Sequence, residues 1–86
     1  MESLLSSFYY QYTKRVDAIY VTLDSGNFAY TVDLDHRRHI DLDASGRPIG
    51  VELLNVSKGV RLADLPRADE LARELERAGI KVLVAP

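Results

Sequence analysis

Apolar and polar residues alternate along the first two-thirds of the chain, as they do in strands that bury one face. The alternation is most regular over residues 28–35, where every second residue is large and apolar, beginning with Phe28 and Tyr30. A repeat of two residues fits a strand better than any helical pattern. The same reasoning predicts five strands in all, over residues 8–12, 17–23, 28–35, 39–43 and 48–54.

A helical repeat follows Pro66, a residue suited to the first position of a helix. We expect Asp64 or Leu65 to precede it as the cap and Gly79 to end the helix. The apolar positions recur along one helical face, at Ala68, Leu71, Ala72, Leu75 and Ala78. The apolar residues 80–84 then predict a short final strand, buried in a sheet or against another subunit.

These elements predict an α+β fold: an antiparallel β-meander of about five strands, one α-helix and a short final strand that returns to a sheet edge. Residues 1–86 form a single domain in this interpretation, because no linker or internal repeat interrupts the pattern. Residues 8–62 make the meander and residues 63–86 a helix–strand extension.

The strands over residues 39–43 and 48–54 form a hairpin, and side-chain parity indicates the length of its turn. A four-residue turn sets Ile40 opposite Ile49, whereas a three-residue turn would set Ile40 beside Gly50. Because a shift of one residue moves every side chain to the other face, we predict the four-residue turn.

Three residues of this hairpin have predicted structural roles. Asp43 opens the turn, and Gly46 supplies the left-handed residue that such turns need. Gly50 lies inside a strand, which suggests a bulge or a close approach of another group to the backbone.

The preceding hairpin is predicted to pair Leu34 with Ile40, a register that places Asp33 directly opposite Asp41. Like charges in facing positions destabilise a sheet unless they are solvated or neutralised. A bound divalent cation would neutralise them, since carboxylates and imidazole are metal ligands. The candidate ligands are Asp33, Asp41, Asp43 and His39. The simpler alternative, which we favour, is a solvated sheet face whose acids are balanced by nearby arginines, with no metal or cofactor.

Composition and charge narrow the classes of function. The chain has no cysteine, which excludes disulfides and thiolate zinc sites. Its formal net charge is −2 and its basic residues are scattered, which argues against nucleic-acid binding. No apolar stretch is long enough to span a membrane and the first residues do not resemble a signal peptide, so we expect a cytoplasmic protein.

Three segments of the sequence together resemble a known family. They are residues 12–21, which include Asp17-Ala18-Ile19-Tyr20; residues 40–47, Ile-Asp-Leu-Asp-Ala-Ser-Gly-Arg; and residues 49–54, Ile-Gly-Val-Glu-Leu-Leu, followed by Ser57. Their order and spacing resemble those of the prokaryotic family called domain of unknown function 2283, over about residues 8–62. The resemblance implies a small β-rich domain and no established activity.

The sequence favours a small non-enzymatic module that binds protein, as a homodimer or with another small protein as partner. No phosphate-binding glycine loop, Ser-His-Asp set or zinc spacing is present. A domain of this size is thinly stabilised and often relies on self-association. The predicted interface residues are Tyr9 and Tyr20 in the aromatic strands and Val82 and Val84 in the last strand. The alternative is a metal-dependent or acid/base enzyme that uses the hairpin aspartates.

Overall fold

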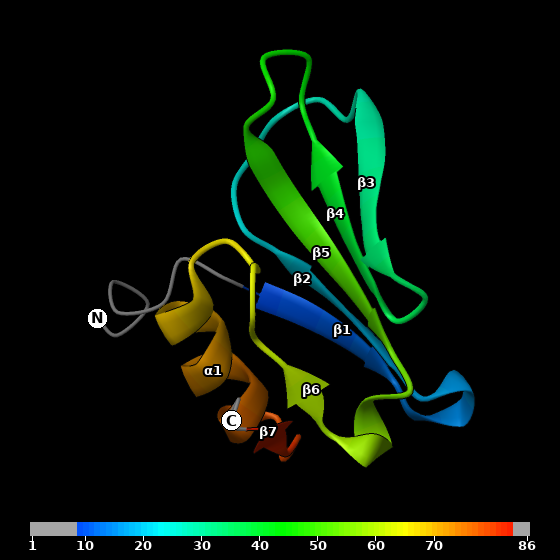
Figure 1. Cartoon of the computed structure of the whole chain (residues 1–86). Coiled ribbons are helices and arrows are strands. Elements are labelled where there is room, and N and C mark those ends of the chain that lie inside the picture. The colour runs from blue at the N-terminus through cyan, green and yellow to red at the C-terminus, as the bar shows by residue number, and fades with distance from the viewer. Residues whose placement is uncertain (1–8, 84–86) are drawn as a thin grey trace.

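The computed structural model describes residues 9–83, which form a five-stranded antiparallel sheet, one helix and a small second sheet (Figure 1). The main sheet consists of β1 (Tyr9–Thr13), β2 (Ala18–Thr22), β3 (Tyr30–Asp35), β4 (Arg38–Leu42) and β5 (Pro48–Leu54). The remaining elements are the 3-10 helices η2 (Lys14–Val16) and η3 (Val56–Lys58), β6 (Val60–Arg61), α1 (Ala68–Arg77) and β7 (Val82–Leu83). The predicted α+β class is confirmed.

The strands of the main sheet follow the order β1-β2-β5-β4-β3. The chain meanders through β1–β2 and again through β3–β4–β5, but β2 pairs with β5 and not with β3. The apolar β5 thereby gains a bonded neighbour on each side. Alternation along each strand shows which face is buried, but it does not show which strands pair.

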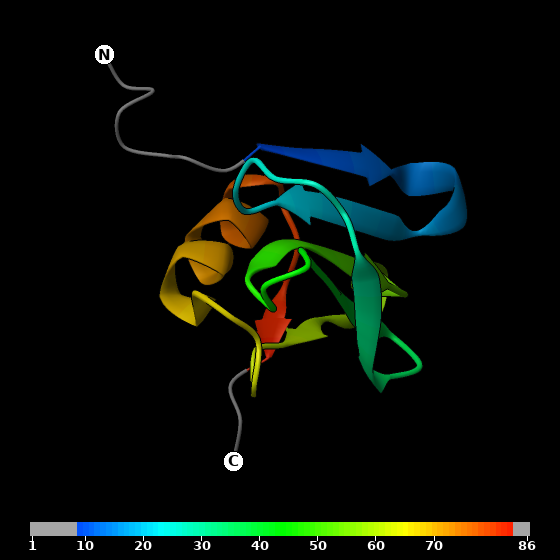
Figure 2. The same ribbon diagram turned by 90° about the horizontal axis from the view of Figure 1, so that it is seen from above.

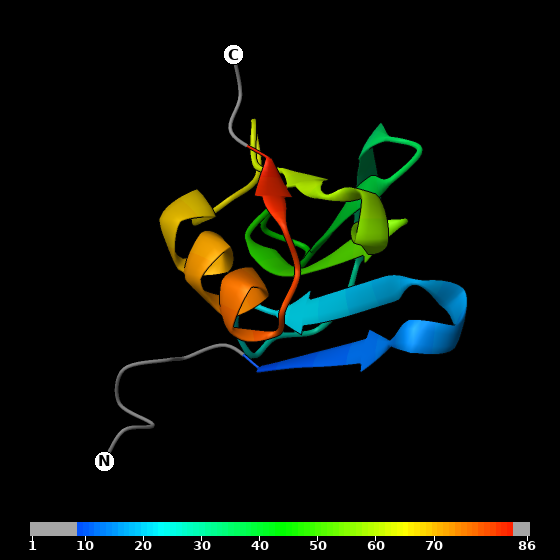
Figure 3. The same cartoon turned by 90° about the horizontal axis from the view of Figure 1, so that it is seen from below.

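The core lies between the sheet and the segments that follow it. α1, β6 and β7 all lie on one side of the sheet (Figures 2 and 3). The residues predicted for the inner face of the second strand, Ile19, Val21 and Leu23, are buried there. Leu71 and Leu75 of α1 have no exposed surface and belong to the same cluster of apolar side chains. Burial of such side chains contributes about 1.5–3 kcal/mol each.

α1 begins two residues later than predicted. Arg67 precedes it with a left-handed backbone (φ +54°), so Pro66 lies in the turn before the helix and neither predicted residue caps it. The Arg67 guanidinium donates a hydrogen bond of 3.0 Å to the carbonyl of Leu23, the residue just after β2. It also pairs with Glu70 in the first helical turn, at 2.7 Å. This tertiary anchor fixes where the helix starts.

The end of α1 agrees with the prediction. Gly79 is left-handed (φ +83°), and its N–H donates to the carbonyl of Glu76. The N–H of Ile80 donates to the carbonyl of Leu75, which completes a Schellman motif. No helix within residues 9–83 is long and apolar enough to cross a membrane.

The last strand does not return to an edge of the main sheet as predicted. β7 pairs in parallel with β6, with Val60 beside Val82, and the two form a separate sheet. Ile80 enters the core directly after Gly79, so the chain continues beneath the main sheet. The N–H of Val60 bonds to the carbonyl of Lys81 at 2.9 Å and holds β7 there.

The turn between β4 and β5 is one residue shorter than predicted. The N–H of Asp43 donates to the carbonyl of Arg47, and the bond encloses three residues, of which Gly46 is left-handed (φ +89°). This turn is the three-residue form that carries a left-handed glycine at its last position. The four-residue turn is therefore wrong.

A bulge inside the hairpin keeps the apolar side chains of both strands on the buried face despite the shorter turn. Leu42 pairs with Pro48, but the next pair is Asp41 with Gly50, so Ile49 is an additional residue on β5. Ile40 consequently faces Val51 and not Ile49. A bulge absorbs one residue and lets both strands keep their apolar side chains on the buried face.

Gly50 lies beneath the aromatic ring of Tyr20. A Cβ at Gly50 would stand 2.6 Å from Cζ of Tyr20 and would overlap the hydroxyl oxygen. The ring therefore occupies the space above the neighbouring strand that a side chain would otherwise fill. Glycine at this position allows Tyr20 to reach from β2 over β5 to β4.

We expect Gly50→Ala to lower the free energy of unfolding by about 2 kcal/mol, because the methyl group displaces the Tyr20 ring. In a Tyr20→Ala background the same change should cost about 0.5 kcal/mol or less, since the space is then open. Urea unfolding of the four proteins measures both costs. An equal cost in the two backgrounds would contradict the contact with Tyr20 as the cause.

Candidate functional site

The face of the sheet opposite α1 carries a row of polar side chains. Tyr20 on β2 faces Glu52 on β5, Glu52 faces His39 on β4, and His39 faces Asp33 on β3. Residues that face one another on neighbouring strands lie close enough for side-chain contact. This polar row joins four of the five strands.

Asp41 accepts hydrogen bonds from both sides. The hydroxyl of Tyr20 donates to one carboxylate oxygen at 2.8 Å, across Gly50. The hydroxyl of Thr31 donates to the other at 2.7 Å. Burial, and then the bond to Asp41, raise the pKa of Tyr20 to about 12. The carboxylate is thus held by neutral donors on β2 and β3.

The β3–β4 register differs from the prediction by two residues. Val32, and not Leu34, pairs with Ile40, and Asp33 faces His39 instead of Asp41. The expected repulsion between two aspartates is therefore absent. Each acid has a hydrogen-bonding partner opposite it, which is the arrangement that cross-strand energetics favours. A bulge between Asp33 and Asp35 accommodates the shift.

Both ring nitrogens of His39 face acceptors. Nδ1 lies 2.6 Å from a carboxylate oxygen of Asp33, and Nε2 lies 3.2 Å from the backbone carbonyl of His36. Neutral imidazole has one N–H, so only the protonated ring can donate to both. The bond to Asp33, and then the bond to His36, raise the pKa of His39 against the opposing effect of burial.

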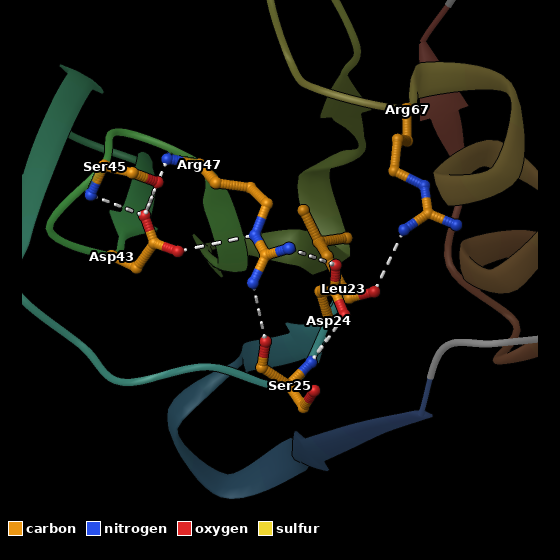
Figure 4. Close-up of polar contacts among 7 residues, drawn as sticks. All are labelled: Leu23, Asp24, Ser25, Asp43, Ser45, Arg47 and Arg67. Atoms are coloured by element: carbon orange, nitrogen blue, oxygen red, sulfur yellow. Dashed lines mark hydrogen bonds and ion pairs between the residues drawn. The ribbon is translucent and has the colours of Figure 1, made fainter.

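Asp43 organises the β4–β5 turn. One of its carboxylate oxygens accepts bonds from the N–H and hydroxyl of Ser45, at 2.9 and 2.6 Å, and from the N–H of Arg47 at 2.9 Å (Figure 4). The Ser45 bond, and then the Arg47 backbone bond, lower the pKa of Asp43. These bonds are internal to the turn.

Arg47 connects this turn to the segment after β2. Its guanidinium lies 3.4 Å from Asp43, 3.8 Å from Asp24 and 3.4 Å from the carbonyl of Ser25 (Figure 4). One side chain thereby links residues of two loops. The arrangement fastens the crossing connection from β2 to β3.

The predicted metal ligands are therefore distributed over separate sites. Asp33 and His39 form one pair, Asp41 belongs to the tyrosine and threonine bonds, and Asp43 belongs to the turn. Within residues 9–83 no group of three or more histidine, aspartate and glutamate side chains is placed to hold a metal ion.

Of the four predicted interface residues, the structure describes the side chains of Tyr20 and Val82. The side chain of Tyr9 and the whole of Val84 lie outside the described residues. Tyr20 is turned toward Asp41, and Val82 is half-buried against the core.

Exposed apolar side chains on β3 and just before it are absent from the predicted interface. Tyr30 and Val32 of β3 are 46% and 40% exposed, and Phe28, two residues before the strand, is 61% exposed. Alternation places Tyr30 and Val32 on the face that bears the core, but it does not show how far the core extends.

Asp17 connects the beginning and end of the segment that resembles a known family. It has a left-handed backbone (φ +58°) just before β2. Its carboxylate accepts bonds from the N–H and the hydroxyl of Ser57, at 2.9 and 2.6 Å, and its carbonyl accepts from Val56. These bonds therefore hold η3 against the residue that precedes β2, which is a structural role.

Comparison with known proteins gives one family. Residues 10–57, more than half of the chain, match the model of a family described as protein of unknown function (DUF2283). The match runs from β1 to the middle of η3 and leaves out β6, α1 and β7. No curated protein and no solved structure matches the chain.

The His39–Asp33 pair predicts a dependence of stability on pH. Because the pKa of His39 is raised in the folded protein, the pair stabilises fully below the unfolded value of about 6.5. That stabilisation is lost as pH rises through the folded pKa. Asp33 is largely exposed, so we expect a contribution of only about 0.5 kcal/mol.

Asp33→Asn should accordingly lower the free energy of unfolding at about pH 6 and leave it nearly unchanged at about pH 9. Titration of the His39 ring by NMR should give a lower pKa in this variant than in the native protein. Asp69→Asn, on the exposed side of α1, is the matched control. A His39 pKa that is the same in Asp33→Asn and the native protein would contradict the assignment.

Proposed function

The chain belongs to the DUF2283 family, and from the form of its sheet we propose that it is a non-enzymatic protein-interaction module that forms a homodimer through β3. The observation that carries this proposal is an edge strand with apolar side chains open to solvent. β3 is bonded to β4 on one side and stands at the end of the sheet order. An edge strand of this kind readily pairs with another strand.

The exposure of β3 follows from where the elements that cover the sheet lie. α1 is the only α-helix within residues 9–83, and it has ten residues. Figure 2 shows α1 on the side of β1 and β2, with β3 at the far side of the molecule. Tyr30 and Val32 are consequently exposed on the core face of β3, and Phe28 is exposed just before the strand.

A second copy of the chain fits this edge because the strand is self-complementary. Antiparallel pairing about a two-fold axis at Val32 sets Tyr30 opposite Leu34 of the second copy and Thr31 opposite Asp33. Apolar residues then face apolar residues, and no aspartate faces an aspartate. The carboxylate of Asp33 is already hydrogen-bonded to His39, so one of its oxygens has a partner within the chain.

The polar groups of the sheet support a non-enzymatic role. Both ring nitrogens of His39 have partners, and the carboxylates of Asp41 and Asp43 accept two or three hydrogen bonds each from their own sheet or turn. These bonds connect strands and close turns. We therefore assign the polar row to stability and β3 to association.

Val32→Lys tests the proposal, because it places a charge in the centre of the expected interface. Val16→Lys is the matched control, since Val16 is 64% exposed. It lies on η2, which connects β1 and β2, and β1 is at the opposite end of the sheet from β3. Light scattering with size-exclusion chromatography at about 20 to 200 µM should show a dimer for the native protein and for Val16→Lys, and a monomer for Val32→Lys.

Two results would overturn the proposal. One is a native protein that is strictly monomeric at about 200 µM. The other is a dimer that persists in Val32→Lys, which would place the contact on another surface. Circular dichroism of each variant verifies that the fold is retained.

A further inference from the structure

A cavity of about 230 Å³ lies between the tip of the β3–β4 hairpin and the β6–β7 pair. None of the four residues of the polar row, Tyr20, Glu52, His39 and Asp33, lines it. Leu53 and Leu54 of β5 form part of its wall, together with Val60 of β6 and Leu83 of β7. The cavity therefore offers an apolar interior to a small ligand.

The apolar wall is closely packed where Leu83 of β7 meets Gly59. A Cβ at Gly59 would stand 2.7 Å from Cγ and Cδ2 of Leu83, so only glycine allows Leu83 to lie against this part of the chain. Gly59 also has a positive φ (+95°), which side-chain-bearing residues rarely adopt. The shape of the cavity is thus set by the backbone of the η3–β6 segment.

Arg38 connects the β3–β4 hairpin to the segment that contains β6, and its charge is compensated by an acid. It is only 8% exposed, and its guanidinium binds Asp35 at 3.0 Å. It also donates to the carbonyls of Arg61 and Ala63, at 3.1 and 2.6 Å. Arg38 and Asp35 together form a neutral support for the cavity.

Two further arginines line the cavity without such compensation. Arg37 and Arg61 are exposed, and within residues 9–83 their guanidinium groups form no hydrogen bond or ion pair. Only one acid, Asp35, lines the cavity, and Arg38 already binds it. The protein as a whole is acidic, so this mouth is a local region of positive charge.

We propose that this cavity binds a small carboxylate that carries a branched aliphatic group. The aliphatic group lies against Leu53, Val60 and Leu83, and the carboxylate lies at the mouth between Arg37 and Arg61. A guanidinium presents parallel N–H donors that match the two oxygens of a carboxylate. A phosphate fits less well, because the apolar wall does not replace its hydration.

The source of such a carboxylate is either a free small acid or the C-terminus of a peptide that ends in an aliphatic residue. The volume admits one side chain together with its carboxylate, since pockets for larger ligands usually exceed about 300 Å³. Both sources share the same recognised chemistry. Acetyl-leucine and a tetrapeptide that ends in leucine distinguish the two sources. Tighter binding of the tetrapeptide indicates a peptide C-terminus, and equal or weaker binding indicates a free small acid.

The experiment is a titration of the full chain followed by ¹H–¹⁵N NMR. The probe is 4-methylpentanoate, and we expect saturable shifts at millimolar concentration that are concentrated at residues 36–38, 53–54 and 59–61. The neutral amide of the same acid and acetate should each bind at least about tenfold more weakly, because one lacks the charge and the other the aliphatic group.

Variants locate the site. Arg37→Gln combined with Arg61→Gln should weaken binding of 4-methylpentanoate about tenfold, whereas Arg15→Gln, an exposed arginine on η2, should not change it. Retained dispersion of the spectrum verifies folding. The proposal is overturned if the amide binds as well as the acid, if inorganic phosphate binds as tightly, or if the shifts lie elsewhere or do not saturate.

Discussion

The central position of β5 is the constraint on which the rest of the structure depends. β5 is bonded to β2 on one side and to β4 on the other, so it joins the β1–β2 hairpin to the rest of the sheet. Val51 and Leu53 are buried on its inner face, while Gly50 on its outer face admits the ring of Tyr20. The bulge at Ile49 allows both arrangements at once, because it keeps the inner face apolar beyond a three-residue turn.

The polar side chains serve this arrangement in two ways. On the outer face, Tyr20 and Thr31 bond to Asp41 across three strand boundaries, and Asp33 bonds to His39. At the ends of the sheet, Asp17, Arg47 and Arg67 fasten loops to neighbouring elements through bonds between residues distant in sequence. A fold with so small a core has a thin margin of stability, and such bonds fix which loop lies beside which strand.

The same geometry leaves two surfaces that the polar bonds do not occupy. α1 covers the part of the sheet near β2 and β5 and does not extend to β3, so apolar side chains are exposed at that edge. Between the hairpin tip and β6, the cavity combines apolar walls with the guanidinium groups of Arg37 and Arg61. We propose the first surface for pairing with a second copy and the second for a small carboxylate with an aliphatic group. Both arise because one short helix and one short sheet cover only part of a five-stranded face.

The sequence by itself determined the local features: five strands, the helix stripe with its end at Gly79, and the inward face that carries Ile19, Val21 and Leu23. These follow from periodicity and from the backbone freedom of glycine, which act over a few residues. Only the tertiary structure decided that β5 lies beside β2, that Asp33 faces His39, and that β7 pairs with β6. Strand alternation repeats every two residues, so a register shift of two residues leaves the pattern unchanged and the choice falls to contacts between distant segments.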